Sequence, residues 1–254
     1  MNPQGPLSGR VALVTGGAVG IGRAISLALA GAGATVGIHF HSSSKDAEET
    51  LRLIHAQGSK AILMPADLTV EKEALGLVDR LIEKAGRLDI LVNNAGSPIK
   101  MSAIEHCSTE LWRQVFDLNV TSAFLVTRQA IPHLRASGHG CIINNLTLSI
   151  QTGGSGGGGP YAAAKGALQV MTRTLARELG PAIRVNAIMP GVIETRHHEV
   201  FSTPAKLADY RKQTPLGRNG TAEEVAQAVL FLAGDGAGFM TGALLDINGG
   251  RFLR

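Results

Sequence analysis

Apolar residues along this chain gather in short, uniformly hydrophobic blocks, and segments with helical periodicity separate these blocks. The first block, residues 10–15, is rich in β-branched residues, and a helical segment over residues 23–32 follows it after a glycine-rich turn. Strands that are apolar on both faces belong to a sheet covered on both sides, and a helix at each crossover makes neighbouring strands parallel. The pattern therefore predicts a doubly wound α/β sheet.

The same alternation continues to the end of the chain. Strands are expected at residues 10–15, 35–40, 61–64, 88–92, 141–146, 183–188 and 243–247. Helices are expected at residues 23–32, 45–57, 71–85, 108–136 and 161–179, and a last one opens with a capping box of Thr221 and Glu224. Ser44 is expected to cap the second helix. No linker or break in composition divides the chain, so we expect residues 1–254 to form a single α/β domain with a parallel sheet of about seven strands and helices on both faces.

Two segments have no place in this scheme. Residues 148–159 are very rich in glycine, and residues 194–220 contain Pro204 and Pro215. Irregular segments at the carboxyl ends of parallel strands are where open α/β sheets bind ligands. We therefore expect both segments to border a site, with the second acting as a substrate loop.

Composition narrows the class of protein. The 32 glycines are nearly twice the usual share of about 7%, yet they follow no collagen-like period, and the hydrophobic residues, 44% of the chain, lie in short blocks. The charged fraction of only 17% excludes a disordered chain. The stretch most similar to a membrane span, residues 24–40, has no charged residue, but it is interrupted by polar residues and is too short to span a membrane. The first ten residues contain no apolar signal segment. Cys107 and Cys141 lack the spacing of metal ligands or of a disulfide framework, so we expect reduced cysteines and a cytoplasmic protein.

The net charge of +4 raises the question of an anionic partner. No run of basic residues is longer than Arg211-Lys212, and the single Trp and two Tyr are not interleaved with basic residues as a stacking platform would be. Binding of nucleic acid is therefore not expected. A phosphorylated cofactor or an anionic substrate fits the charge better.

The glycine-rich turn after the first strand reads Thr-Gly-Gly-Ala-Val-Gly-Ile-Gly over residues 15–22. Gly16, Gly20 and Gly22 allow a sharp turn and a close approach of the backbone to a pyrophosphate, which the N-terminus of the following helix then binds. The turn's place between the first strand and the first helix favours a dinucleotide site over a simple tight turn.

The spacing Gly-x-x-x-Gly-x-Gly, together with further marks in order along the chain, resembles the short-chain dehydrogenase/reductase family, most of all its 3-oxoacyl-carrier-protein reductases. The resemblance covers residues 7–250. Its further marks are Asp67 after the third strand, Asn-Asn-Ala-Gly at residues 93–96, Asn119, Tyr161 with Lys165, and Pro190-Gly191.

The resemblance implies a nicotinamide dinucleotide held along the carboxyl ends of the strands. Its pyrophosphate would lie on the glycine-rich turn, its adenine near Asp67, and its nicotinamide near Ile193 and Thr195. The residues implied are Gly16, Val19, Gly20, Ile21, Gly22, Asp67, Leu68, Asn94, Ala95, Gly96, Tyr161, Lys165, Pro190, Gly191, Ile193 and Thr195. From the sequence alone, Asp67 is equally able to cap a turn, and the asparagines at 93 and 94 to satisfy backbone groups at the strand end.

The end of the second strand bears on the choice between NAD and NADP. An acidic residue there would bind the ribose 2′-hydroxyl of NAD and repel a 2′-phosphate. This stretch instead contains His41, Ser42 and Ser43, and no acid precedes Asp46. The hydroxyls and the imidazole favour NADP, although Val19 stands where many NADP-preferring relatives carry Arg.

Tyr161 and Lys165 carry the predicted chemistry. Four residues apart on a helix, they share one face. A nearby ammonium favours the phenolate, so Lys165 is expected to lower the Tyr161 pKa from about 10. The resemblance implies hydride transfer between the nicotinamide and a carbonyl or alcohol, with Tyr161 exchanging the proton, Lys165 holding the ribose, and Asn119 keeping a water in the proton relay.

The family usually places a Ser after the fifth strand to bind the substrate oxygen. Alignment from Gly140 puts Thr147 at that position, and Thr supplies the same hydroxyl. The usual spacing to Tyr161 instead falls beside Ser149, which would face the same way as Thr147 on a strand. We favour Thr147 because residues 153–159 form a loop that is longer than in most relatives.

Other roles remain open at this point. A noncatalytic protein that senses the nucleotide on the same fold is the alternative function, and the presence of Asn119, Tyr161 and Lys165 argues against it. His197 and His198 are adjacent without an acidic partner at metal-ligand spacing, so no metal is expected. Residues 98–107, 149–159 and 194–213 would select the substrate, whose identity the sequence does not specify. The resemblance implies a homotetramer built on the helices that hold Phe116 and Tyr161 and on the last strand.

Overall fold

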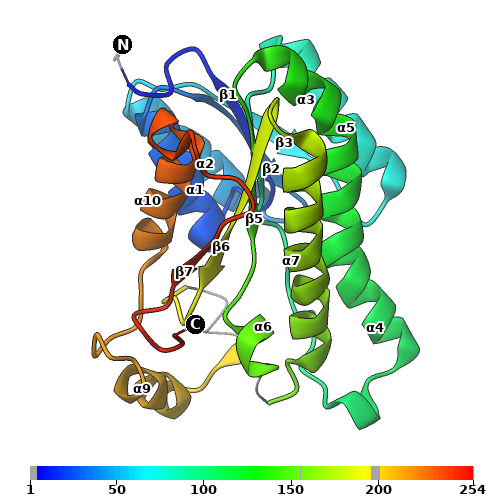
Figure 1. The fold of residues 1–254 in the computed structure, drawn as a ribbon, viewed down its shortest axis with the longest axis vertical. Helices are drawn as coiled ribbons and strands as arrows, with labels where there is room; N and C mark the ends of the chain where they lie inside the picture. Colours follow the sequence, from blue (N-terminus) through cyan, green and yellow to red (C-terminus); the bar gives the residue numbers. More distant parts are fainter. Residues whose placement is uncertain (1–4, 155, 196–200, 254) are drawn as a thin grey trace.

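The computed structural model describes residues 5–154, 156–195 and 201–253, which fold around one open sheet of seven parallel strands (Figure 1). The strand order is β3-β2-β1-β4-β5-β6-β7. The strands are β1 (Val11–Val14), β2 (Thr35–Phe40), β3 (Ala61–Pro65), β4 (Ile90–Asn93), β5 (Gly140–Asn145), β6 (Ile183–Pro190) and β7 (Leu244–Ile247). The predicted doubly wound α/β fold is confirmed.

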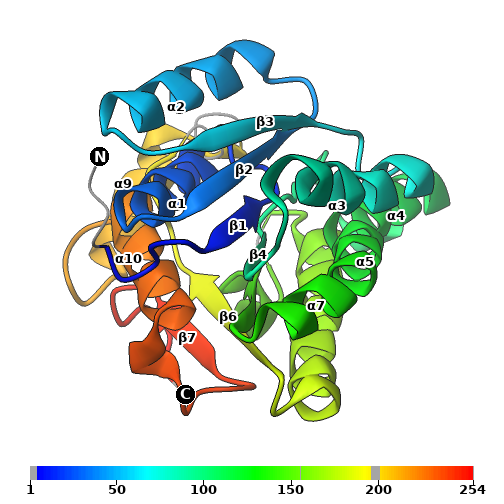
Figure 2. The same ribbon diagram turned by 90° about the horizontal axis from the view of Figure 1, so that it is seen from above.

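Helices cover both faces of the sheet, as its uniformly apolar strands require (Figure 2). One face carries α1 (Gly20–Gly31), α2 (Ser44–Ala56) and α10 (Ala222–Ala233). The other carries α3 (Glu71–Ala85), α5 (Ser122–Ser137) and α7 (Gly159–Leu179), with α4 (Thr109–Phe116) beside α7. Each face has its own hydrophobic core, and the central strands contribute side chains to both.

The reversal of strand order between β1 and β4 sets the place of the site. The chain winds outward from β1 through β2 to β3, then returns to β4 and winds the other way. The connections that leave the carboxyl ends of β1 and β4 therefore go to opposite faces of the sheet and open a crevice between them, the usual ligand position in an open α/β sheet. The glycine-rich turn follows β1 directly.

Buried amides fix the helix that carries Tyr161 and Lys165. Asn144 of β5 accepts a hydrogen bond from Asn93 of β4 at 2.9 Å and donates one to Thr172 of α7 at 2.9 Å. Asn93 also donates to Thr127 of α5 at 2.9 Å. Unpaired buried polar groups are costly, so these hydrogen bonds fix the positions of α5 and α7 along the strands β4 and β5.

The structure differs from the predicted elements in four places. Residues 108–136 are divided between α4 and α5 by a π-helix, Asp117–Thr121. The two segments without predicted structure contain short helices, α6 (Ser149–Thr152) and α9 (Pro204–Lys212). Helix α2 begins at Ser44, so this residue is not its cap. The capping box of Thr221 and Glu224 is confirmed.

Two predictions remain, one about a pair of histidines and one about a membrane-spanning helix. His197 and His198 lie outside the described residues, so the prediction about them stays untested. In the described ranges, no helix combines the length and apolar character that crossing a bilayer requires.

Candidate active site

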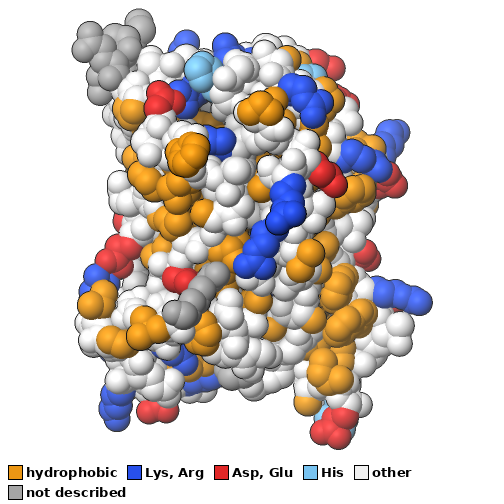
Figure 3. Space-filling view, in the orientation of Figure 1, with side chains coloured by type: hydrophobic (Ala, Val, Ile, Leu, Met, Phe, Trp, Pro, Cys, Tyr) orange, Lys and Arg blue, Asp and Glu red, His pale blue; other side chains and the backbone are white. Residues whose placement is uncertain are grey.

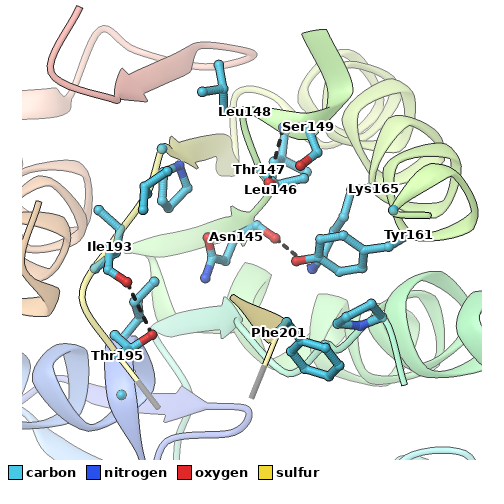
Figure 4. A pocket seen from close by; sticks show the side chains of 18 of the residues that line it. Asn145, Leu146, Thr147, Leu148, Ser149, Tyr161, Lys165, Ile193, Thr195 and Phe201 are labelled. Carbon is cyan, nitrogen blue, oxygen red and sulfur yellow. Dashed lines mark hydrogen bonds between the residues drawn. The ribbon is translucent and has the colours of Figure 1, made fainter. Parts of the chain in front are cut away.

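A cleft of about 470 Å³ runs along the carboxyl ends of the strands and brings together most of the predicted site residues (Figure 4). Its volume falls within the range of small-molecule sites. The predicted residues that line it are Gly16, Val19, Gly20, Ile21, Gly22, Asn94, Ala95, Gly96, Thr147, Ser149, Tyr161, Lys165, Pro190, Gly191, Ile193 and Thr195.

The glycine-rich turn has the geometry of an anion cradle. Gly16 adopts a φ of 61°, which side-chain-bearing residues rarely take, and a Cβ on Gly22 would overlap the carbonyl oxygen of Gly16. Asn94 holds the turn by donating from Nδ2 to the carbonyl oxygens of Thr15 and Gly16 at 2.9 and 3.1 Å. The open side of the turn meets the N-terminus of α1, whose free N–H groups suit a phosphate.

A histidine that the sequence analysis missed completes the support of this turn. His39 of β2 is buried, its Nδ1 accepts from Gly16 N at 2.9 Å, and its Nε2 lies 3.1 Å from the carbonyl oxygen of Ala66. Burial lowers the pKa of His39 to about 4, so the ring is neutral and carries its proton on Nε2. An imidazole in a strand that is otherwise apolar was the available signal.

Tyr161 and Lys165 extend from the first turns of α7 into the cleft toward Asn145 (Figure 4). Lys165 is buried, and its Nζ donates to the carbonyl oxygen of Asn145 at 2.8 Å. The same Nζ lies 5.8 Å from the centroid of the Tyr161 ring. The predicted pair therefore shares one wall of the cleft.

The pKa values of this pair differ from the prediction. Burial lowers the pKa of the Lys165 ammonium to about 8 and raises the pKa of the Tyr161 phenol to about 12. Desolvation disfavours the charged form of each group, and the short contact of the ammonium is with a backbone carbonyl rather than with the phenol. The prediction that Lys165 lowers the Tyr161 pKa is wrong for this structure.

Asn119 lies in the π-helix, one layer behind the cleft. Its Nδ2 donates to the carbonyl oxygens of Ser97 and Val115, both at 2.8 Å, and its Oδ1 accepts from Ser97 N at 3.1 Å. The side chain therefore bonds backbone groups, and its role in a water relay stays a prediction. π-Helical turns recur at functional sites, and this one points the amide at the segment after β4.

Gly96 separates Asn119 from Lys165. A Cβ at this position would lie 2.5 Å from Asn119 Oδ1 and 2.9 Å from Lys165 Nζ. Both distances are shorter than real Cβ contacts, so the absence of a side chain here lets the amide oxygen and the ammonium approach the same point.

Both candidates for the hydroxyl that binds the substrate oxygen line the cleft. Because β5 ends at Asn145, the strand alternation invoked for Thr147 and Ser149 does not apply to them. The chain turns instead, with Ser149 N donating to Thr147 Oγ1 at 3.2 Å as α6 begins.

Asn145 is a cleft residue that the sequence analysis did not select. Its Nδ2 donates to Asn94 Oδ1 at 2.9 Å, while its own Oδ1 is buried without a hydrogen-bond partner. An orphaned buried acceptor suggests a ligand hydroxyl as its missing donor. The pair Asn-Asn ending an apolar strand was the sequence signal.

The residues predicted to contact the adenosine lie at the ends of β2 and β3, outside the lining of the cleft. Asp67 Oδ1 accepts from the backbone N and the hydroxyl of Thr69 at 2.9 and 2.7 Å, which lowers its pKa, so this oxygen does cap a turn. Asp67 Oδ2 lies 3.8 Å from Nε2 of the exposed His41. Ser42 is exposed, Ser43 makes no capping bond to α2, and Leu68 is buried.

The glycine-rich loop before α7 borders the same cleft through Gly154 and Gly158. Gly157 has a φ of 87°, its carbonyl oxygen accepts from Ser102 N at 2.9 Å, and a Cβ on it would lie 2.7 Å from that nitrogen. The loop is therefore docked against the segment after β4.

Comparisons with known proteins agree with this geometry. A family model described as enoyl-(acyl carrier protein) reductase matches residues 16–251. A candidate ketoacyl reductase of the granaticin polyketide synthase from Streptomyces violaceoruber is 38% identical over 99% of this chain and 98% of its own length. A cyclopentanol dehydrogenase from Comamonas sp. is 38% identical over 97% of this chain and 98% of its own. An NADH-dependent reductase of alginate metabolism superposes with a TM-score of 0.90 at 33% identity, covering 98% of this chain and 99% of its own.

The contact at Gly96 predicts an effect on stability. We expect Gly96→Ala to lower the free energy of unfolding by about 1–3 kcal/mol, because the added methyl group displaces Asn119 or Lys165. Gly166→Ala is the matched control, because a Cβ there meets nothing within 4 Å and Ala favours the helix. Urea unfolding of both variants checks this, and equal stabilities would contradict the contact.

The lowered pKa of Lys165 predicts a dependence of stability on pH. Between the folded value of about 8 and the unfolded value of 10.5, the unfolded chain binds more protons, so stability rises with pH. We expect the unfolding free energy of the wild type to rise relative to that of Lys165→Met by about 1 kcal/mol per pH unit from pH 8 to 10. Urea unfolding across this range measures it, with the exposed Lys212→Met as control. A difference that does not change with pH would show an unperturbed lysine.

Proposed function

Because the chain belongs to the short-chain dehydrogenase/reductase family and is an NAD(P)-dependent oxidoreductase, we propose that Tyr161 is its general acid and base in hydride transfer to or from a carbonyl or secondary alcohol. Within the family it resembles the 3-oxoacyl-carrier-protein reductases. The observation that carries the proposal is the position of Tyr161 and Lys165 in one cleft with the glycine-rich turn. Nothing in the site favours the noncatalytic alternative.

The cleft fits a nicotinamide dinucleotide. The glycine cradle at residues 16–22 suits its pyrophosphate, and the orphaned Asn145 Oδ1 beside Lys165 suits a ribose hydroxyl. The bound cofactor supplies or accepts a hydride at C4 of its nicotinamide ring. The other residues proposed to hold it are Asp67 and Leu68 at the adenine end, Asn94, Ala95 and Gly96 along the riboses, and Pro190, Gly191, Ile193 and Thr195 at the nicotinamide end.

In the direction of reduction, the carbonyl carbon gains a hydride and its oxygen gains the phenolic proton of Tyr161. A pKa of about 12 keeps Tyr161 protonated at neutral pH, so it is ready to donate. In the direction of oxidation, Tyr161 first gives its phenolic proton to the proposed water relay, and the phenolate then takes the hydroxyl proton as the carbon loses the hydride. Lys165, whose ammonium donates to the Asn145 carbonyl, would hold the nicotinamide ribose.

Neighbouring groups complete the proposed constellation. Thr147 donates its hydroxyl to the substrate oxygen, with Ser149 as the alternative. Asn119 takes part in the water relay that returns a proton to Tyr161, and its support is that its side chain lies close to Lys165 across Gly96.

We propose NADP as the preferred cofactor. The support is the exposed His41 and Ser42 at the end of β2, where a 2′-phosphate would lie, together with Ser43, whose hydroxyl is not used to cap α2. The cytoplasmic location stays a prediction from the sequence.

A homotetramer stays a proposal as well. Hydrophobic side chains gather on the side of the molecule formed by α4 and α7 (Figure 3). In α4, Trp112 stacks on Phe116 with ring centroids 4.8 Å apart, and in α7, Val170 is 62% exposed. These helices are the ones expected to form the subunit interface.

The test of the proposed function is Tyr161→Phe. We expect kcat/KM to fall about 100-fold or more, because the variant loses its acid and base, while the Kd for NADPH stays within about threefold. A panel of ketones and secondary alcohols followed by NADPH absorbance measures the first, and fluorescence titration the second. Thr147→Ala and Ser149→Ala in the same assay assign the substrate hydroxyl. Turnover by Tyr161→Phe at the wild-type rate would overturn the role of Tyr161.

Cofactor preference is tested at His41. We expect kcat/KM to be higher with NADPH than with NADH, and His41→Asp to lower that ratio about tenfold or more, because a carboxylate repels the 2′-phosphate. His55→Asp adds the same charge on the exposed side of α2 and should leave the ratio unchanged. Equal efficiency with the two cofactors in the wild type would remove the preference.

A further inference from the structure

Two cationic side chains border the cleft on the side of α9 and the C-terminal segment. Lys206 of α9 and Arg251, which follows β7, both line the cleft that contains Tyr161. Figure 1 shows α9 and the segment that follows β7 at the same end of the molecule as α6, the end at which the sheet's carboxyl edge opens. Neither residue belongs to the proposed acid–base or cofactor machinery.

The two cations are gathered around one aromatic ring. The Arg251 guanidinium carbon lies 4.2 Å from the centroid of the Tyr210 ring, and Lys206 Nζ lies 5.7 Å from the same centroid. Lys206 Nζ is also 3.4 Å from the position that a Cβ on Gly156 would occupy. The ammonium therefore reaches from α9 to the glycine-rich loop just before Tyr161.

The charges of these cations are not balanced by carboxylates in the described part of the chain. No described residue that lines the cleft is Asp or Glu. Arg251 donates to the neutral Gln213 Oε1 at 3.0 Å, and no ion pair of Lys206 or Arg251 with a described carboxylate is present. The Tyr210 ring attracts both cations but does not neutralise them, so an anionic ligand would meet two positive charges gathered at one place.

We propose that Lys206 and Arg251 form an anion subsite, so that the substrate carries a carboxylate or phosphate in addition to the carbonyl or alcohol that reacts at Tyr161. The guanidinium suits either group because its planar fork matches two oxygens at once, and the ammonium adds a point charge. The inference rests on the proposed function and names its substrate class.

The test compares substrates that differ only in charge. Oxo acids of increasing spacing (3-oxobutanoate, 4-oxopentanoate and 5-oxohexanoate) are each paired with the corresponding amide, and dihydroxyacetone phosphate is paired with dihydroxyacetone. We expect the kcat/KM of at least one anion to exceed that of its neutral partner about tenfold or more at low salt, and this advantage to shrink as salt rises. The pair with the largest anion-to-neutral ratio of kcat/KM shows whether the subsite prefers a carboxylate or a phosphate.

Variants then assign the advantage to the subsite. Lys206→Gln and Arg251→Gln should each reduce the anion-to-neutral ratio to about threefold or less, whereas Lys206→Arg should retain it. Lys212→Gln is the matched control, because Lys212 belongs to the same helix but does not line the cleft.

The outcomes separate this inference from the proposed function. The subsite is wrong if every neutral compound is reduced as efficiently as its anionic partner. It is also wrong if the higher kcat/KM of the anions persists in both glutamine variants. In either case the proposed hydride transfer still stands. Absence of turnover with all these compounds and with the ketone and alcohol panel would overturn the proposed function itself, and the subsite with it.

Discussion

A single buried ammonium organises the site. The Lys165 side chain is buried, and its ammonium donates a hydrogen bond to one backbone carbonyl, that of Asn145. Keeping this charge out of water is costly, so the groups around it must leave room for the ammonium and remain in place. Gly96 supplies the room, and the π-helix supplies the position of Asn119 on the other side of that glycine.

From this ammonium, hydrogen bonds connect the ends of five strands. Lys165 bonds the Asn145 backbone of β5, and the Asn145 side chain bonds Asn94, which follows β4. Asn94 holds the turn after β1 at Gly16, whose N–H is bound by His39 of β2. The other nitrogen of His39 meets the residue after β3. The catalytic candidates and the glycine-rich turn therefore belong to one polar network at the sheet edge. A shift of the residues at one end of this network changes the hydrogen bonds at the other end.

The features that could be predicted from the sequence are those that depend on residues close together in the chain. Blocks of apolar residues gave the strands, and glycine spacing gave the turn at residues 16–22. His39 and Asn145 were missed because their roles arise from contacts between strands that are distant in sequence. The direction of the Tyr161 pKa shift was predicted wrongly because spacing along a helix reports proximity but not desolvation. Lys206 and Arg251 meet only because α9 and the C-terminal segment converge on one ring.

The backbone conformation and close packing of the loop before α7 require glycine. Gly157 and Gly154 adopt left-handed backbone conformations, and a side chain on either would collide with neighbouring backbone. A loop so constrained has little freedom to diversify by substitution, whereas α9 on the opposite side of the cleft carries no such restriction. Divergence of substrate range among proteins built on this scaffold is therefore expected to accumulate in α9, and directed evolution of this enzyme has its accessible positions there.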